Sequence, residues 1–363
     1  MEVEYSAVTV PYFQRRVKRA LLGQADVKRG FEFADSTADW WEMVKSNVKD
    51  LAIEHSKRKN KEYDDEFTAL CKKLQGNPSD AEAVVKLKAL LDKKSEGAKV
   101  RCRMSFLDQQ GRPSKMFAEE RKNAEDRHID AVETPEGYIT SDPQRIGDVY
   151  VDFYRELFSK KDVDIELQGE FSASLETTVN TPISAGLEEP ITSKELFAAV
   201  KAMAPNKSPG SDGLPREFYL KCWDFIGADL LELYNESLVR GSLSPSQRVA
   251  VVTLLHKKGD RRKPANKRPI SLLNTDYKIL SKAMSMRMSK ALPDISNDHQ
   301  TGAVKVRGIH HNLLMLRDIV AFISSRDMGG AIVSLDLEKA FDRVDHQYLF
   351  SVLEKFGFGP NFV

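Results

Sequence analysis

The residue types best suited to chemistry lie in the stretch SLDLEKAFD, at residues 334–342. The apolar run from Ala331 to Leu335 predicts a strand that ends at Asp336, before the chain turns toward a helix. A carboxylate in that position is costly to a core but suits a cation at the edge of a sheet. In phosphoryl transfer with two Mg²⁺ ions such an aspartate can bridge both metals, and the adjacent carbonyl of Leu337 is a natural further ligand. The pattern therefore predicts a metal site, although a strand-end aspartate before a helix is more often an N-cap.

A large aromatic ring follows Asp336 in the same stretch. Phe341 would lie beside the sugar of an incoming nucleotide, where it leaves no room for the 2′-hydroxyl group. A site built here would therefore select deoxynucleotides. Helical spacing then resumes over residues 349–356, and Gly357 is the expected C-terminal cap.

A second chemical signal is the basic stretch HKKGDRRKPANKR at residues 256–268, which holds seven Lys and Arg residues against a single Asp. It lies between a β-branched run at residues 249–255, which predicts a strand, and the extended segment PISLL at 269–273. This layout is that of a basic hairpin over polyphosphate, where Lys acts as a point charge and Arg as a bidentate fork. A surface loop with a nonspecific nucleic-acid or nuclear-import role fits the stretch equally well.

The amino-terminal part of the sequence is predominantly helical in its periodicity. Apolar spacing from Ala38 to about Lys99 predicts two helices, and Ser79 with Glu82 gives the capping-box signature of the second. The turn residues Gly111-Arg112-Pro113 and Pro135-Glu136-Gly137 interrupt the next region. A further helix is expected at about residues 146–158.

Helix boundaries are also marked in the second half of the sequence. Thr192 and Glu195 repeat the capping-box spacing at the start of a helix that ends before Pro205. The segment NKSPGSDGLPREFY, which follows, is interpreted as a loop, and another helix from about Trp223 to Arg240 would be closed by Gly241.

These elements divide the sequence into three regions. We expect a helical linker region at 1–110, an irregular or helical connection at 111–190, and a third region at 191–363. Residues 159–190 are rich in Ser, Thr, Glu and Gly and poor in periodicity, so they are interpreted as a long connection with a soft domain boundary. Because helices alternate with short strands, the predicted fold class is α+β.

Composition excludes several classes of protein. The 363 residues are 41% hydrophobic and 30% charged, which is ordinary for a globular protein, and the net charge of +1 gives no general argument for nucleic-acid binding. The three cysteines, Cys71, Cys102 and Cys222, show no zinc or disulfide spacing and fit a reducing compartment. No apolar run approaches the roughly 18 residues that span a bilayer, so we expect an intracellular chain with no membrane partner, in the nucleus or the cytoplasm.

Four blocks, taken together and in order, carry a family resemblance. They are KSPGSDGLP with EFY at residues 207–219, RPISLLN with YKIL at 268–280, QTG through Arg307 and Asn312, and SLDLEKAFDRVDH at 334–346. They resemble successive blocks of LINE-type (non-LTR) retrotransposon reverse transcriptases, the last of them motif A. The segment that begins at Trp40-Trp41 resembles the linker between endonuclease and polymerase in such elements.

The resemblance implies a fold, a reaction and a set of residue roles. The fold would be the fingers and the first part of the palm of a truncated right-hand polymerase, preceded by an α-helical region. The reaction would be RNA-templated DNA synthesis with Mg²⁺, using an RNA template, a DNA primer and deoxynucleoside triphosphates. Asp336 would be catalytic and would bind metal together with Leu337. Nucleotide contacts would come from Lys257, Arg268, Lys339, Ala340 and Phe341, and nucleic-acid contacts from Lys258, Arg261, Arg262, Lys263, Gln300 and Arg307.

The sequence departs from the family pattern at three positions. His256 stands at a usual Pro, Ala303 at a usual Phe, and Val306 at a usual Gly. A buried Phe is worth on the order of 2 kcal/mol, so packing around Ala303 is expected to be weaker than in the family.

No [FY]xDD sequence and no glycine-rich block follow motif A within the 363 residues. A two-metal site made from these residues would have one carboxylate side chain, so we expect a fragment without polymerase activity of its own. The alternatives are a nucleic-acid-binding module that keeps the basic loop, a remnant that does not fold, and a mobile-intron maturase with a related core. The sequences KSPGSDG and EFY favour the LINE type over the maturase. The oligomeric state stays open.

Overall fold

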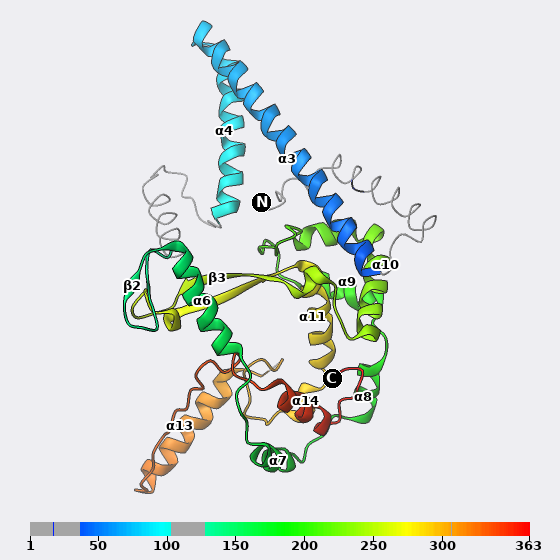
Figure 1. Cartoon of the computed structure of the whole chain (residues 1–363), viewed down its shortest axis with the longest axis vertical. Coiled ribbons are helices and arrows are strands. Elements are labelled where there is room, and N and C mark those ends of the chain that lie inside the picture. Colours follow the sequence, from blue (N-terminus) through cyan, green and yellow to red (C-terminus); the bar gives the residue numbers. More distant parts are fainter. Residues whose placement is uncertain (1–16, 18–36, 103–127, 306) are drawn as a thin grey trace. The chain divides into compact units, whose positions relative to one another are not determined.

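A computed structural model describes residues 17, 37–102, 128–305 and 307–363 of the chain (Figure 1). The turn expected at Gly111-Arg112-Pro113 and the unusual Val306 lie outside the described residues, as do parts of the linker region expected at 1–110. The chain forms two compact units, and each is considered by itself. Unit 1 comprises residues 1–146, 204–233 and 242–277, and unit 2 comprises 147–203, 234–241 and 278–363.

The described residues are mostly helical, with a few short strands. The α+β class predicted from the sequence is therefore correct only in its coarse form. The helices are α3 (Thr37–Gly76), α4 (Ala81–Cys102), α6 (Pro143–Phe158), α7 (Ile165–Ala173), α8 (Thr181–Glu188), α9 (Ser193–Ala202), α10 (Arg216–Arg240), α11 (Thr275–Met288), α12 (Leu292–Ile295), α13 (Ile309–Ser325) and α14 (His346–Lys355), with 3-10 turns η1 (Pro245–Arg248) and η2 (Pro264–Asn266). The strands are β1 (Val132–Glu133), β2 (Ile139–Thr140), β3 (Ala250–His256) and β4 (Lys267–Leu273). None of the described helices has the length and apolar character needed to cross a bilayer.

Unit 1 buries one face of the first half of α3. Trp41, Val44 and Val48 recur at helical spacing and are at most 1% exposed. The Trp41 ring lies 6.4 Å from the ring of Tyr219 on α10, which is also fully buried. The helix α10 begins at Arg216, directly after Pro215, and not near Trp223 as expected. Proline is favoured just before or within the first turn of a helix, so the EFY residues extend α10 toward its start.

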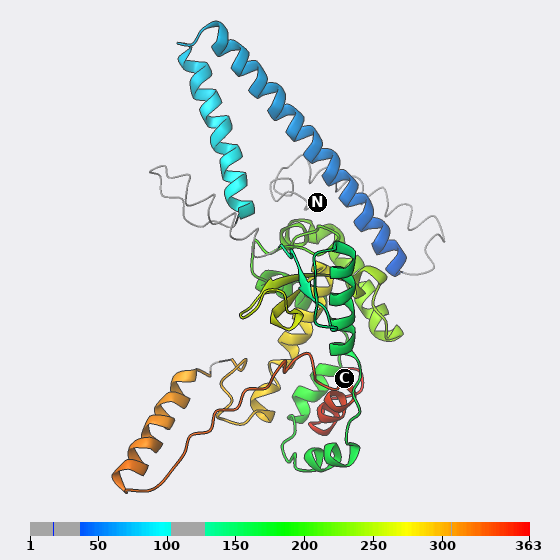
Figure 2. The same cartoon turned by 60° about the vertical axis from the view of Figure 1, so that its left-hand side comes forward.

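The second half of α3 and α4 form a long antiparallel helical hairpin (Figure 2). Its turn shows a small error in the sequence prediction, because Asp80 and not Ser79 caps α4. The Asp80 carboxylate accepts a hydrogen bond from the backbone N–H of Ala83 at 3.0 Å. Glu82, expected to complete a capping box, instead forms an ion pair with Lys86 at 2.6 Å. The cap is shifted by one residue because aspartate at the N-cap position satisfies the free N–H groups of the first turn.

The predicted hairpin at residues 249–273 is confirmed. β3 pairs with β4 in an antiparallel register that places Leu255 opposite Arg268 and His256 opposite Lys267. A smaller hairpin, β1–β2, turns at the expected Pro135-Glu136-Gly137, with Gly137 at a φ of +88°. Gly137 adopts this left-handed conformation without the steric cost that a Cβ would add.

In unit 2, side-chain contacts from α11 hold the start of α9. The predicted capping box of α9 is present, with Thr192 accepting from the backbone of Glu195 and Glu195 accepting from Thr192. The buried guanidinium of Arg287 donates to both carboxylate oxygens of Glu195, at 2.7 and 2.8 Å. The same guanidinium also donates to the carbonyls of Leu187, Glu189 and Pro190. Arg287 therefore joins the end of α8 to the start of α9 through hydrogen bonds.

The long connection expected at residues 159–190 is wrong in part, because it contains the helices α7 and α8. Asp164 caps α7 through the backbone N–H of Leu167, and α7 packs near α14 (Figure 1). The loop after α14 docks against α8, where Glu188 accepts hydrogen bonds from the backbone of Asn361 and Phe362. The prediction of α14 is confirmed, with Gly357 at a φ of +85° after its end.

Candidate nucleotide and nucleic-acid site

The basic hairpin brings two of the expected nucleotide-binding residues onto one face. Side chains alternate along each strand, and the register pairs Leu255 with Arg268, so these two share a face. The backbone N–H of Lys257 donates to the carbonyl of Asn266 at 2.9 Å and continues the ladder past His256. Lys257 therefore falls on the same face as Leu255 and Arg268. Both cationic side chains are exposed.

The tip of this hairpin is internally braced. Asp260 accepts three hydrogen bonds from Arg262, from its backbone N–H at 2.9 Å and from its guanidinium at 3.0 and 2.8 Å. These bonds hold the pKa of Asp260 at about 2, below its usual value. Gly259 adopts a φ of +78°, and the Asn266 amide crosses the loop to the carbonyl of Asp260 at 3.0 Å. The loop is thus preorganised, and the charge of Arg262 is largely neutralised.

A second contact ties the basic loop to the β1–β2 hairpin. The backbone N–H of Glu133 donates to the carbonyl of Arg262 at 3.0 Å, and the Glu133 carboxylate lies 3.8 Å from the Lys263 ammonium. The basic residues expected to contact nucleic acid therefore differ in their surroundings. All four are exposed, and Arg262 and Lys263 in addition lie beside the carboxylates of Asp260 and Glu133.

The base of the hairpin is held by the loop with the sequence KSPGSDG. Asn274, which follows β4, accepts a hydrogen bond from the backbone N–H of Asp212 at 3.2 Å and donates to the carbonyl of Ser246 at 3.0 Å. A Cβ on Gly210 would lie 2.2 Å from Oδ1 and 2.5 Å from the backbone nitrogen of Asn274. The Thr275 hydroxyl donates to the carbonyl of Leu214 at 2.6 Å. The loop therefore acts as scaffolding for the hairpin, and glycine is required by this close approach.

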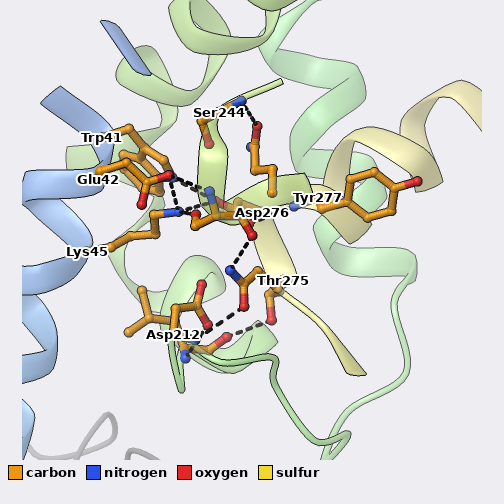
Figure 3. A network of polar contacts seen from close by, with 12 residues as sticks. Trp41, Glu42, Lys45, Asp212, Ser244, Thr275, Asp276 and Tyr277 are labelled. Atoms are coloured by element: carbon orange, nitrogen blue, oxygen red, sulfur yellow. Dashed lines mark hydrogen bonds and ion pairs between the residues drawn. The ribbon is translucent and has the colours of Figure 1, made fainter. Parts of the chain in front are cut away.

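A buried polar network connects the same base to α3 (Figure 3). The carboxylate of Asp276 is fully buried and accepts from the Trp41 indole at 2.8 Å and from the Lys45 ammonium at 3.1 Å. Lys45 also contacts Glu42 at 3.3 Å and the hydroxyl of Ser246. The sequence did not predict the burial of Lys45 and Asp276, because lysine and aspartate usually face solvent.

Asp212 lies beside this network and has one oxygen without a partner among the described residues. Its other carboxylate oxygen accepts from the backbone N–H of Leu214 at 3.0 Å. Burial, together with repulsion from the Asp276 carboxylate, raises the pKa of Asp212 to about 6.

The residues of motif A are found in a different arrangement from the one expected. No strand is assigned at 331–335 in the described part of the chain, and Val333 and Leu335 are 75% and 88% exposed. The predicted strand is therefore wrong for this structure. A strand forms only when its backbone groups pair with a neighbour, and no described strand pairs with this segment.

The expected metal and nucleotide residues of motif A are all on the surface of unit 2. Asp336, Leu337 and Ala340 are exposed, and the Phe341 side chain is 98% exposed. The Lys339 ammonium lies 4.5 Å from the centre of the Phe153 ring, and its backbone adopts a φ of +52°. The carboxylate of Asp336 and the carbonyl of Leu337 are oxygen donors of the type that Mg²⁺ prefers. The described residues contain no group of three or more His, Cys, Asp or Glu placed to hold a metal ion.

The remaining expected nucleic-acid residues organise a loop within unit 2. Arg307 donates to the carbonyls of Asn297 at 2.6 Å and Gln300 at 3.3 Å. The amide of Gln300 in turn donates to the carbonyl of Gly302 at 3.1 Å. Ala303, at the position of a usual Phe, is exposed and has a φ of +63°. Contacts of Gln300 and Arg307 with nucleic acid stay a prediction.

Residues 255–363 match the family model described as reverse transcriptase (RNA-dependent DNA polymerase). Over 93% of its length the chain is 37% identical to a Xenopus laevis protein named transposon TX1 uncharacterized 149 kDa protein. Over 46% of its length it is 28% identical to the Pol polyprotein from the type-1 retrotransposable element R2 of Popillia japonica. Over 49% it is 27% identical to the probable RNA-directed DNA polymerase from transposon BS of Drosophila melanogaster. The chain spans 27%, 22% and 20% of the lengths of these three relatives.

Proposed function

Since this chain carries the reverse transcriptase region of a non-LTR retrotransposon, we propose that it supplies the fingers and the first palm segment of an RNA-directed DNA polymerase. The β3–β4 hairpin would hold the triphosphate of a deoxynucleotide, and the exposed segment at 334–342 would present the first metal ligand. The observation that carries this proposal is the placement of Lys257 and Arg268 on one exposed face of a braced hairpin.

The chemistry of that face suits a polyphosphate. An arginine fork and a lysine point charge together match the oxygens of a phosphate chain. The pairing of Arg262 with Asp260 keeps the loop in shape, so the backbone that carries Lys257 and Arg268 is ordered before a ligand binds. Preorganised donors lose less conformational entropy on binding than mobile ones.

Asp336 and the carbonyl of Leu337 would hold Mg²⁺, and Phe341 would exclude ribonucleotides. When bound, the metal would activate the primer hydroxyl and neutralise charge on the phosphate. We propose that the 363 residues alone do not extend a primer, because Asp336 is the one carboxylate that motif A supplies to a metal pair. Incubation with a primed RNA template, deoxynucleotides and Mg²⁺ tests this, and extension that Asp336→Asn abolishes would refute it.

The nucleic-acid part of the proposal is tested by the affinity for a primed RNA template. The double variant Lys257→Gln, Arg268→Gln should bind at least tenfold more weakly, since hydrogen bonds to charged groups contribute about 1.5–3 kcal/mol. The matched control Lys221→Gln, Lys355→Gln removes the same charge from exposed positions on helices α10 and α14. Equal affinities for both double variants would exclude the hairpin as a contact surface.

A nucleic-acid-binding module without catalysis is the second candidate function. It is favoured by the exposure of Lys258 and Arg261 beyond the proposed triphosphate contacts. In that case RNA binding would persist in the absence of Mg²⁺ and would be insensitive to Asp336→Asn.

A further inference from the structure

Unit 2 contains a pocket of about 330 Å³ between the start of α9, the end of α11 and the segment before α13. The apolar residues of its lining are Ala198, Ala283 and Met286. Three lysines also line it, with Lys194 on α9, Lys290 shortly after α11 and Lys305 before α13.

The charged residues that line this pocket are mostly cationic. The remaining charged lining residues are Arg287 and Glu195, which pair with one another at 2.7 Å. Glu195 is also engaged by the backbone and hydroxyl of Thr192, and its pKa is lowered to about 2, chiefly by the Arg287 hydrogen bond. It stays ionised but has no capacity left for the lysines. With four cationic residues and one anionic residue, the lining has a net charge of +3.

The lysines themselves are not neutralised within the described part of the chain. All three are exposed, and the structure gives none of them an ion pair or a side-chain hydrogen bond there. Three like charges around one hollow repel one another, and an anion bound between them would relieve that repulsion. The positive end of the α9 dipole adds to the same field.

We propose that this pocket binds a phosphodiester group of a nucleic-acid strand, at a site separate from the β3–β4 hairpin. The three ammonium groups would contact phosphate oxygens as point charges, and the apolar part of the lining would contact the adjoining sugar. This inference rests on the proposed function only in taking nucleic acid as the ligand. It assigns to Lys194, Lys290 and Lys305 a role that no sequence motif indicated.

The test compares the salt dependence of single-stranded RNA binding among four proteins. They are the unaltered chain, the pocket variant with Lys194, Lys290 and Lys305 changed to Gln, a control with Lys160, Lys161 and Lys355 changed to Gln, and the hairpin variant Lys257→Gln, Arg268→Gln. Each phosphate neutralised on a single strand contributes about 0.7 to the slope of log affinity against log salt. Because the pocket holds one phosphodiester group, the pocket variant should lose about 0.7 from the slope, and the control should lose much less.

Two further arms keep the outcomes distinct. Changing the three pocket lysines to Arg keeps the charge and should restore most of the slope, which a purely structural effect of the Gln variant would not predict. In acetylation footprinting, RNA should protect Lys194, Lys290 and Lys305 but not Lys355. Equal protection by inorganic phosphate at the same phosphate concentration would identify a small-anion site and overturn the inference.

The RNA affinities of the pocket variant and the hairpin variant distinguish failure of the pocket site from failure of the proposed hairpin site. If the hairpin variant loses RNA affinity while the pocket variant matches its control, the pocket is not a nucleic-acid site and the proposed function stands. If only the pocket variant loses affinity, the pocket is supported and the hairpin assignment falls. An unaltered chain that binds no RNA at low salt overturns the pocket inference outright.

Discussion

The Lys45 ammonium lies 3.1 Å from a carboxylate oxygen of Asp276, although 231 residues separate the two in sequence. The Asp276 side chain is completely buried and that of Lys45 is 5% exposed. This pair joins the first half of α3 to the start of α11, directly after the basic hairpin. The first half of α3 is thereby built into the same unit as the hairpin.

Replacing Lys45 should therefore destabilise unit 1. The substitution Lys45→Met keeps the length of the side chain but removes the ammonium that pairs with the buried carboxylate of Asp276. Breaking a buried ion pair on one side costs about 3–5 kcal/mol. The free energy of unfolding in urea would measure the loss. The control Lys57→Met changes an exposed residue of the same helix and should alter stability by roughly 0.5 kcal/mol or less.

Asp212 gives a prediction of pH dependence. Its pKa in the folded chain is about 6, above the value of 3.8 expected in an unfolded chain, because the carboxyl group is buried beside Asp276. Folding therefore takes up a proton between these values, and the contribution of Asp212 to stability is present below about pH 4 and is lost as the pH rises through 6. Asp212→Asn removes this pH-dependent contribution to the free energy of unfolding, because the amide does not titrate.

The difference in unfolding free energy between Asp212→Asn and the unaltered chain should grow by about 2–3 kcal/mol between pH 4 and pH 7, in favour of the variant. The amide keeps an acceptor for Leu214, so the local hydrogen bond persists. Urea titrations at several pH values would measure the difference. A difference that is constant over this range would show that Asp212 is not perturbed by its burial.

Gly210 offers a steric test of the scaffold. Gly210→Ala would place a Cβ 2.5 Å from the backbone nitrogen of Asn274, where no flexible side chain can move aside. We expect a loss of about 1–3 kcal/mol or more, together with weaker RNA binding as the hairpin base shifts. Gly147→Ala is the matched control, because no atom lies within 4 Å of its added Cβ and helix α6 favours alanine. Equal stabilities of the two variants would contradict the close packing of the loop.

The parts of the fold that local chemistry determines could be predicted from the sequence. The capping box of Thr192 and Glu195 lies within one turn, and Gly241 and Gly357 mark helix ends through their own backbone freedom. The β3–β4 hairpin follows from two short β-prone runs joined by one loop. Its consequence, Lys257 and Arg268 on one face, also depends only on the register of neighbouring strands.

Features that depend on distant partners were not predictable from the sequence. From the sequence alone, Asp276 resembles an ordinary surface residue. Its burial depends on contacts with Trp41 and Lys45, which lie far from it along the chain. The short helix α7 depends on its Asp164 cap and on packing near α14, so its sequence alone was interpreted as a connection. The apolar run at 331–335 has strand propensity, but without a paired neighbour among the described residues it forms no strand.

The most direct test of the central claim is a titration of the chain with a deoxynucleoside triphosphate in the presence of Mg²⁺. Lys257→Gln and Arg268→Gln should each weaken the affinity by about tenfold or more, because each removes a charge-assisted contact with phosphate. Arg262→Gln should change it little, since the Arg262 guanidinium is already held by Asp260. Equal affinities for all four proteins, or a loss confined to Arg262→Gln, would contradict the assignment of the hairpin as the triphosphate site.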